Sequence, residues 1–124
     1  MNGSILIIDD DKDTLETLRD VLQEKGYWIE TAKTGKEAIM TAREWFFDIA
    51  LIDLKLPDMS GITVLKIFQL KYPHMIKIMI TGHTELQNTV DAMNVGANAY
   101  IMKPIDHERL SQLIGYKELI NTLQ

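Results

Sequence analysis

Near its amino terminus the chain reads ILIIDDDKDTLETLRDVLQEKG, residues 5–26. The first four of these residues form a continuous β-branched and leucine run, which is typical of a strand covered on both faces. Leucines then recur at the spacing of one helix face, at Leu15, Leu18 and Leu22, and Gly26 stands where such a helix would end. The stretch predicts a buried strand followed by a helix, with acidic residues at the turn between them.

The same strand–helix pattern recurs along the rest of the chain. We expect further strands at residues 27–32, 49–52, 75–80 and 100–102, each followed by a helix with an apolar face. These helices begin at good N-terminal caps or capping boxes: Thr34 with Glu37, Ser60, Thr84 with Gln87, and Asp106. Strict alternation predicts a doubly wound α/β fold, with a five-stranded parallel sheet and helices on both faces.

Composition narrows the class of protein. A chain of 124 residues suits one domain, and its formal net charge of -5 argues against a nucleic-acid-binding face. There is no cysteine, so disulfides and thiolate metal sites are excluded. No apolar run approaches the roughly 20 residues that span a bilayer, and no signal-peptide pattern opens the chain. We therefore expect a cytoplasmic protein without membrane contact.

Polar residues whose side chains could bind a metal or take part in a reaction follow four of the predicted strands. Asp9 and Asp10 follow the first, Asp53 the third, Thr81 the fourth and Lys103 the fifth. The carboxyl ends of parallel strands meet at one edge, where such sheets place their functional residues. Carboxylates about 5 Å apart repel by roughly 3 kcal/mol per pair at an effective dielectric near 20. Oxygen ligands without histidine or cysteine favour Mg²⁺ as the ion that relieves this repulsion.

A lysine and a hydroxyl beside such a metal would make a site for a phosphoryl group. Lys103 could neutralise its oxygens, Thr81 could donate a hydrogen bond, and Asp53 could be the nucleophile that forms an acyl phosphate. Taken singly, these residues have ordinary explanations as a turn aspartate, a strand-end hydroxyl and a solvated cation, and the acidic run could simply cap the first helix. The prediction depends on their joint occurrence.

Four segments, at residues 5–11, 51–61, 80–83 and 96–104, resemble the signature segments of response-regulator receiver domains. The resemblance covers about residues 4–114, so the whole chain, 1–124, is interpreted as one receiver. Residues 115–124 would be the end of the last helix or the start of a linker to an output domain, if the receiver is not a stand-alone one. The family implies the flavodoxin-like strand order 2-1-3-4-5.

The resemblance also implies a metal site and a phosphorylation site. Asp10 would bind Mg²⁺ directly and Asp9 through water. Asp53 would be both a ligand and the phosphoacceptor, and the backbone carbonyl of Lys55 would be a further ligand.

Switching residues are implied in the same way. Thr81 and Tyr100 match the family's switch pair, in which the hydroxyl moves toward the phosphoryl group and the ring turns inward. Lys103 and Pro104 match a lysine followed by a cis peptide bond, a conformation open almost only to X-Pro bonds. Lys55 and His83 lie where receivers tune hydrolysis, and we expect slow self-dephosphorylation because neither would readily orient a water molecule.

The implied partners are a histidine kinase or phosphotransfer protein, and a second copy through the face of the fourth helix, fifth strand and fifth helix. Catalysis would be limited to the domain's own phosphorylation and dephosphorylation. The rival enzyme, a Mg²⁺-dependent hydrolase of the haloacid dehalogenase type, would need Thr or Val where Asp13 stands. Gly115 is the chief departure, since glycine inside a helix costs about 1 kcal/mol relative to alanine and could bend or end the last helix.

Overall fold

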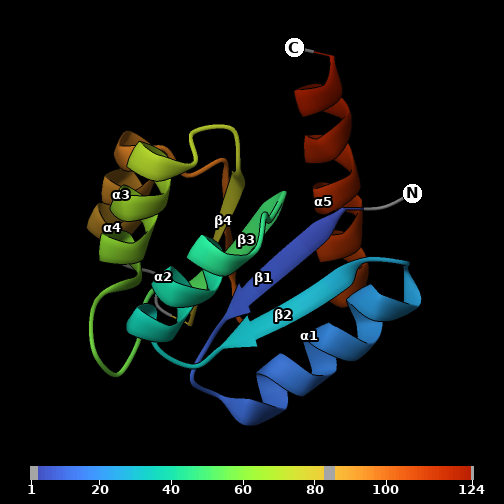
Figure 1. Ribbon diagram of the computed structural model, residues 1–124, viewed down its shortest axis with the longest axis horizontal. Coiled ribbons are helices and arrows are strands. Elements are labelled where there is room, and N and C mark those ends of the chain that lie inside the picture. Colours follow the sequence, from blue (N-terminus) through green and yellow to red (C-terminus); the bar gives the residue numbers. More distant parts are fainter. Residues whose placement is uncertain (1–2, 83–85, 124) are drawn as a thin grey trace.

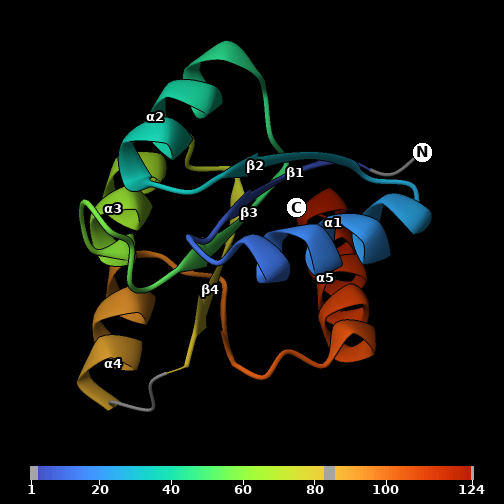
Figure 2. The same cartoon turned by 90° about the horizontal axis from the view of Figure 1, so that it is seen from below.

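The computed structural model describes residues 3–82 and 86–123, in which five strands alternate with five helices. In chain order they are β1 (Ser4–Ile8), α1 (Lys12–Glu24), β2 (Trp28–Ala32), α2 (Gly35–Glu44), β3 (Ile49–Asp53), α3 (Gly61–Lys71), β4 (Ile76–Thr81), α4 (Leu86–Val95), β5 (Ala99–Met102) and α5 (His107–Thr122). All neighbouring strands are parallel, in the order β2-β1-β3-β4-β5. Helices α1 and α5 cover one face of the sheet, and α2, α3 and α4 cover the other (Figures 1 and 2). The predicted fold and strand order are confirmed.

Strand β1 shows why the strands of this sheet are continuous apolar runs in the sequence. Its side chains alternate between two separate cores, because successive residues of a strand point to opposite faces. Ile5 and Ile7 pack in the layer that includes α1 and α5, whereas Leu6 and Ile8 pack in the layer that includes α2, α3 and α4. All four are at most 1% exposed. Truncating a leucine or isoleucine at such positions to alanine typically costs about 2–5 kcal/mol.

Helix beginnings follow the predicted capping residues. Asp11, Thr34, Ser60 and Asp106 are the N-caps of α1, α2, α3 and α5, and each side chain accepts a backbone N–H from the first turn. Thr84, the predicted cap of α4, lies outside the described residues. Residues close in sequence therefore determine where these four helices begin.

Helix α5 differs from expectation at Gly115. The helix continues through this glycine to Thr122, with no interruption. Contacts on both sides stabilise it: Ile114 is fully buried, and the Tyr27 hydroxyl donates a 2.7 Å hydrogen bond to Glu118 Oε1. These contacts outweigh the roughly 1 kcal/mol that glycine costs a helix. Among the described helices, none is long and apolar enough to cross a membrane.

A buried lysine lies near the amino ends of β4 and β5. Lys77 is 1% exposed, and its Nζ donates a hydrogen bond to Gln69 Oε1 in α3. Its backbone N–H donates to Asn98 Oδ1 at 2.8 Å. Gly96, with a φ of 123°, lies so close that a Cβ there would be 2.8 Å from Gln69 Cδ. Burial lowers the pKa of the Lys77 ammonium below its usual value.

Candidate functional site

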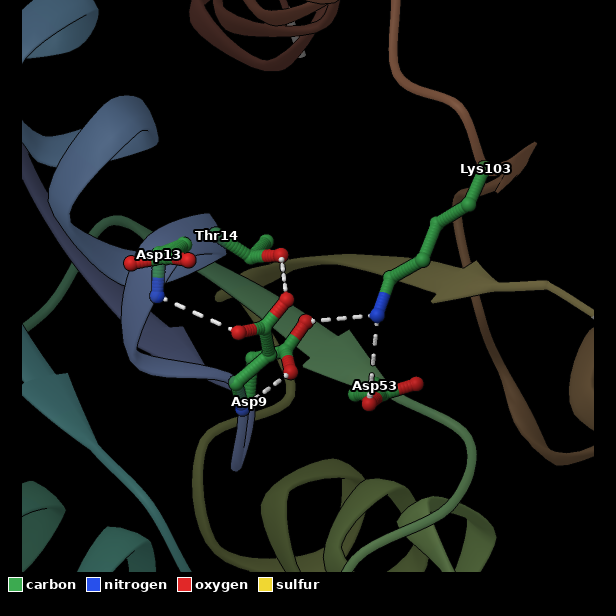
Figure 3. A network of polar contacts seen from close by, with 6 residues as sticks. Asp9, Asp13, Thr14, Asp53 and Lys103 are labelled. Carbon is green, nitrogen blue, oxygen red and sulfur yellow. Dashed lines mark hydrogen bonds and ion pairs between the residues drawn. The ribbon is translucent and has the colours of Figure 1, made fainter.

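The carboxyl edge of the sheet brings together most of the predicted site residues. Asp9 follows β1 directly, Asp53 and Thr81 are the last residues of β3 and β4, and Lys103 follows β5. The backbone N–H of Lys103 donates to the Thr81 carbonyl at 2.7 Å. Figure 3 shows the side chains of Asp9, Asp53 and Lys103 converging above this edge. The strand directions alone therefore place these groups side by side.

Three carboxylates form a compact oxygen donor set. One oxygen each from Asp9, Asp10 and Asp53 lies within 4.8 Å of the others. Asp9 and Asp53 are 2% and 6% exposed, whereas Asp10 is exposed. Hard divalent cations such as Mg²⁺ prefer oxygen ligands and keep several waters, which an exposed position on one side of the site permits. The residues present fit a magnesium ion.

Lys103 holds the two buried carboxylates together. Its Nζ lies 2.9 Å from Asp9 Oδ2 and 3.5 Å from Asp53 Oδ2 (Figure 3). Burial by itself lowers the pKa of Lys103, but the hydrogen bond to Asp9 and the charges of Asp53 and Asp9 outweigh it, so the pKa is raised. The ammonium is therefore a permanent positive charge at this edge. The peptide bond between Lys103 and Pro104 is cis.

Asp53 has the most perturbed carboxyl group of the site. Burial and then the negative charge of Asp9 raise its pKa from 3.8 to about 6, against the opposing effects of Lys103 and the Lys55 backbone N–H. A carboxylate that is ionised at a cost gains more from a nearby cation than an exposed one does. Perturbed groups of this kind, lying beside a specific charge partner, are typical of functional sites.

Asp11, in the same acidic run of residues 9–13, has a structural role. Asp11 caps α1: its Oδ1 accepts the Asp13 backbone N–H at 3.1 Å and its Oδ2 accepts the Thr14 hydroxyl at 2.7 Å. The Asp11 backbone N–H in turn donates to Asp9 Oδ1 at 2.9 Å. Within the acidic run, Asp9 and Asp10 therefore belong to the carboxylate cluster, whereas Asp11 caps α1 and helps to orient Asp9.

The loop between β3 and α3 folds back on the end of β3. Lys55 and Ser60 pair as an isolated antiparallel bridge, and the Gly61 N–H donates to the Leu54 carbonyl at 2.7 Å. A Cβ at Gly61 would collide with the carbonyl oxygen of Asp53, so only glycine fits there. The side chain of Lys55 is exposed, and its backbone lies two residues from Asp53 at the base of this loop.

The predicted switch residues lie on neighbouring strands. Thr81 is 1% exposed at the end of β4, and Tyr100 is a half-buried residue of β5 that packs against the core beneath α2, α3 and α4. Tyr100 is paired in register with Met79, two residues before Thr81. His83, expected to tune hydrolysis, lies outside the described residues.

Sequence reasoning missed the role of Asp58. Its Oδ1 accepts the Gly35 backbone N–H at 2.8 Å and its Oδ2 accepts the Lys36 backbone N–H at 2.9 Å. From sequence Asp58 is an ordinary turn residue, and its partners are more than twenty positions away. The local signal was the pair of N–H groups at the start of α2 that Thr34 leaves without an acceptor, but nothing local identifies Asp58 as their partner.

The model of the response regulator receiver domain family matches residues 5–115, nearly the whole chain. This protein belongs to that family. It is thus a receiver of two-component signalling, and the haloacid dehalogenase alternative gains no support.

Relatives and solved structures agree with this assignment. The chain is 33% identical over 117 residues to the alginate biosynthesis transcriptional regulatory protein AlgB of Pseudomonas aeruginosa, covering 94% of the chain and 26% of that protein. It is 32% identical over 109 residues to the transcriptional regulatory protein ZraR of Escherichia coli, covering 88% of the chain and 25% of that protein. The chain thus spans about a quarter of the length of these curated relatives. A CheY-like receiver domain protein from Methanospirillum hungatei superposes with a TM-score of 0.95 at 39% identity, with 98% of each chain covered.

Proposed function

We propose that this receiver accepts a phosphoryl group on Asp53 from a histidine kinase or phosphotransfer protein, with Mg²⁺ bound at the cluster formed by Asp9, Asp10 and Asp53. The observation that carries the proposal is the buried Asp53 carboxyl, whose pKa is raised to about 6 beside Asp9 and Lys103. Such a carboxylate combines a nucleophilic oxygen with a surplus of negative charge that calls for a cation. The family assignment supports the same reading.

The metal would be held by Asp10, Asp53 and the Lys55 backbone carbonyl, with Asp9 acting through water. When bound, Mg²⁺ supplies positive charge that offsets the repulsion among the carboxylates and neutralises phosphoryl oxygens. The carboxylate oxygens needed for this already lie within 4.8 Å of one another.

Phosphoryl transfer would use residues already in place. An oxygen of the Asp53 carboxylate forms a bond to phosphorus while the P–N bond of phosphohistidine breaks. The electron pair of that bond stays on the imidazole nitrogen. Lys103, whose Nζ is 3.5 Å from Asp53 Oδ2, can interact with the negative charge of the incoming group, and Thr81 can donate its hydroxyl hydrogen to a phosphoryl oxygen.

Phosphorylation would then change the affinity of the domain for its partners. A ligand shifts a two-state equilibrium only by its differential interaction with the two states, typically about 1–3 kcal/mol. Thr81 and Tyr100 would transmit this difference to the face formed by α4, β5 and α5, where a second copy or an output domain could bind. We place the receiver core at residues 4–114 and interpret residues 115–124 as the end of the last helix or the start of a linker. We also propose that the domain acts in the cytoplasm and does not itself bind nucleic acid.

The acyl phosphate should be long-lived. Lys55 and His83 lie two residues beyond Asp53 and Thr81, and neither is a carboxylate or amide that would readily orient a hydrolytic water. Exchanging either residue for Asn or Glu should change the decay rate of phosphorylated protein. Unchanged decay in both variants would show that these residues do not control hydrolysis.

The decisive experiment is phosphorylation by acetyl phosphate, followed by intact-protein mass spectrometry. Wild type should gain one phosphoryl group in the presence of Mg²⁺, and Asp53→Asn should gain none. Asp20→Asn, which changes an exposed aspartate of α1, is the matched control and should behave as wild type. Equal labelling of Asp53→Asn, or full labelling of wild type in EDTA, would refute the proposal.

A further inference from the structure

The loop between β3 and α3 lies against the beginning of α2 (Figures 1 and 2). Asp58 makes this contact with both carboxylate oxygens, which accept the N–H groups of Gly35 and Lys36 at 2.8 and 2.9 Å. The first N–H groups of a helix have no acceptor within the helix. The N-cap Thr34 accepts that of Glu37, so Asp58 completes the capping of α2 from a distant segment.

Close packing accompanies these hydrogen bonds. Met59 lies over Gly35 so tightly that a Cβ at Gly35 would collide with the Met59 Sδ and Cγ atoms. The backbone N–H groups of Lys36 and then Gly35 lower the pKa of Asp58, so the carboxylate is charged and forms charge-assisted hydrogen bonds. Loop and helix are therefore in contact at two successive loop residues.

The same loop begins at Asp53, the proposed phosphorylation site. Its base is closed by the pairing of Lys55 with Ser60 and by the hydrogen bond from the Gly61 N–H to the Leu54 carbonyl. Asp58 fastens the part of the loop farther from the sheet. Residues 55–60 are thus held at two points: at their base beside Asp53, and at Asp58 on α2.

We propose that Asp58 is a positioning residue for Mg²⁺: by fastening the loop to α2, it holds the Lys55 carbonyl where the metal requires it. This inference rests on the proposed function. A ligand held in place before binding does not have to be ordered when the ion arrives, and that ordering would otherwise weaken affinity. Loss of groups that orient metal ligands typically weakens binding by about 10–100-fold, and for this loop we expect about tenfold.

The test is calorimetric titration of Mg²⁺ into wild type, Asp58→Ala, Asp58→Asn and Glu37→Gln. Asp58→Ala should bind about tenfold more weakly. Asp58→Asn keeps one oxygen acceptor of two and should fall between Asp58→Ala and wild type. Glu37→Gln removes an exposed negative charge from the first turn of α2 and leaves the loop contact in place, so it should bind as wild type.

Two further measurements separate positioning from a general loss of structure. At saturating Mg²⁺, Asp58→Ala should be phosphorylated by acetyl phosphate at the wild-type rate, and only the Mg²⁺ concentration needed should rise. In metal-free protein, the Lys55 and Gly61 amides should exchange with solvent faster than in wild type, while amides of β1 and β3 keep their protection. Failure of either expectation would overturn the proposal.

The outcomes distinguish this inference from the proposed function. If wild type binds Mg²⁺ and is phosphorylated, but Asp58→Ala binds Mg²⁺ equally well, Asp58 has no positioning role and the proposed function stands. If Glu37→Gln weakens binding as much as Asp58→Ala does, the effect is one of charge, and the inference fails. If wild type binds no Mg²⁺ at all, the proposed function fails and the inference falls with it.

Discussion

Two lysines at opposite ends of neighbouring strands have opposite surroundings. Lys103 follows β5 at the carboxyl edge, where Asp9 and Asp53 lie 2.9 and 3.5 Å from its Nζ, and its pKa is raised. Lys77 lies near the amino end of β4, where its Nζ donates to the amide oxygen of Gln69, and its pKa is lowered by burial. The difference shows that neighbouring charge, and not burial, makes a lysine's charge favourable. The charge of Lys103 is stabilised by two carboxylates, whereas burial of the Lys77 charge costs free energy.

The largest effect is expected when Lys103 is replaced. Lys103→Gln leaves the Asp9 and Asp53 carboxylates close together without their shared cation. Removing one partner of a buried ion pair costs about 3–5 kcal/mol, and because the Lys103 side chain is 28% exposed we expect about 2–3 kcal/mol in metal-free protein at pH 7. Urea unfolding in EDTA measures this change.

Lys12→Gln is the matched control for this variant. Lys12 is an exposed lysine of α1 whose Nζ lies 3.9 Å from Glu16 Oε1, and exposed ion pairs contribute little to stability. Added Mg²⁺ should restore part of the stability lost in Lys103→Gln but change the Lys12→Gln difference little. If the free energy of unfolding falls no more in Lys103→Gln than in the control, the ion pairs of Lys103 with Asp9 and Asp53 do not stabilise the protein as proposed.

The second effect concerns Asp53 and has the opposite sign. Its pKa of about 6 in the folded protein is above its ordinary value, so the stability that it contributes is complete below about pH 4 and is lost as the pH rises through 6. In EDTA at pH 7, Asp53→Asn should therefore be more stable than wild type by about 1–2 kcal/mol, after allowing for solvent screening. The difference should fall toward zero at pH 4. A difference that does not change with pH would contradict the raised pKa.

A smaller gain is expected at the other end of the sheet. Lys77→Met removes a buried charge whose ammonium donates to the neutral amide of Gln69, and should stabilise the protein by about 1 kcal/mol at pH 7. Because the pKa of Lys77 is lowered, wild type gains stability as the pH rises, and the difference should narrow in alkaline solution. Thermal unfolding at about pH 7 and about pH 9.5 measures this difference in stability. A clear loss of stability would show that the hydrogen bond to Gln69 outweighs the burial of charge.

The smallest change is expected for Asp10→Asn. Asp10 belongs to the same carboxylate group but is exposed, so solvent already screens much of its repulsion with Asp9 and Asp53. The variant should melt slightly higher than wild type in EDTA and should lose most of the stabilisation that Mg²⁺ gives wild type. A lower melting temperature in EDTA would mean that Asp10 makes favourable contacts in the metal-free protein.

The fold and the location of the candidate site could be predicted because both depend on local patterns. The alternation of apolar runs with helical spacing sets the strand directions, and these bring Asp9, Asp53 and Lys103 to one edge. Capping residues such as Asp11 and Asp106 fix the helix starts within one turn of sequence. These features need no knowledge of how distant segments pack.

The rest depends on packing between distant segments. Lys77 interrupts an apolar strand, and only the position of Gln69 in α3 explains where its ammonium goes. Asp58 finds its partners on α2, across more than twenty residues of sequence. The continuity of α5 through Gly115 likewise depends on the contact between Tyr27 and Glu118, which are 91 positions apart. No local pattern contains these pairings.

The contact of Gly96 with Gln69 restricts the order in which this region can change during evolution. An alanine at position 96 would press on the Gln69 side chain that accepts the Lys77 hydrogen bond, and it would also strain a backbone whose φ is 123°. Shortening Gln69 first would make room, but it would leave the Lys77 ammonium buried without that acceptor. Lineages that have already replaced Lys77 with an apolar residue can lose Gln69 at little cost, and only then does position 96 become free of the steric clash. We therefore expect substitutions at these three positions to be accepted in a fixed order, with Lys77 changing first and Gly96 last.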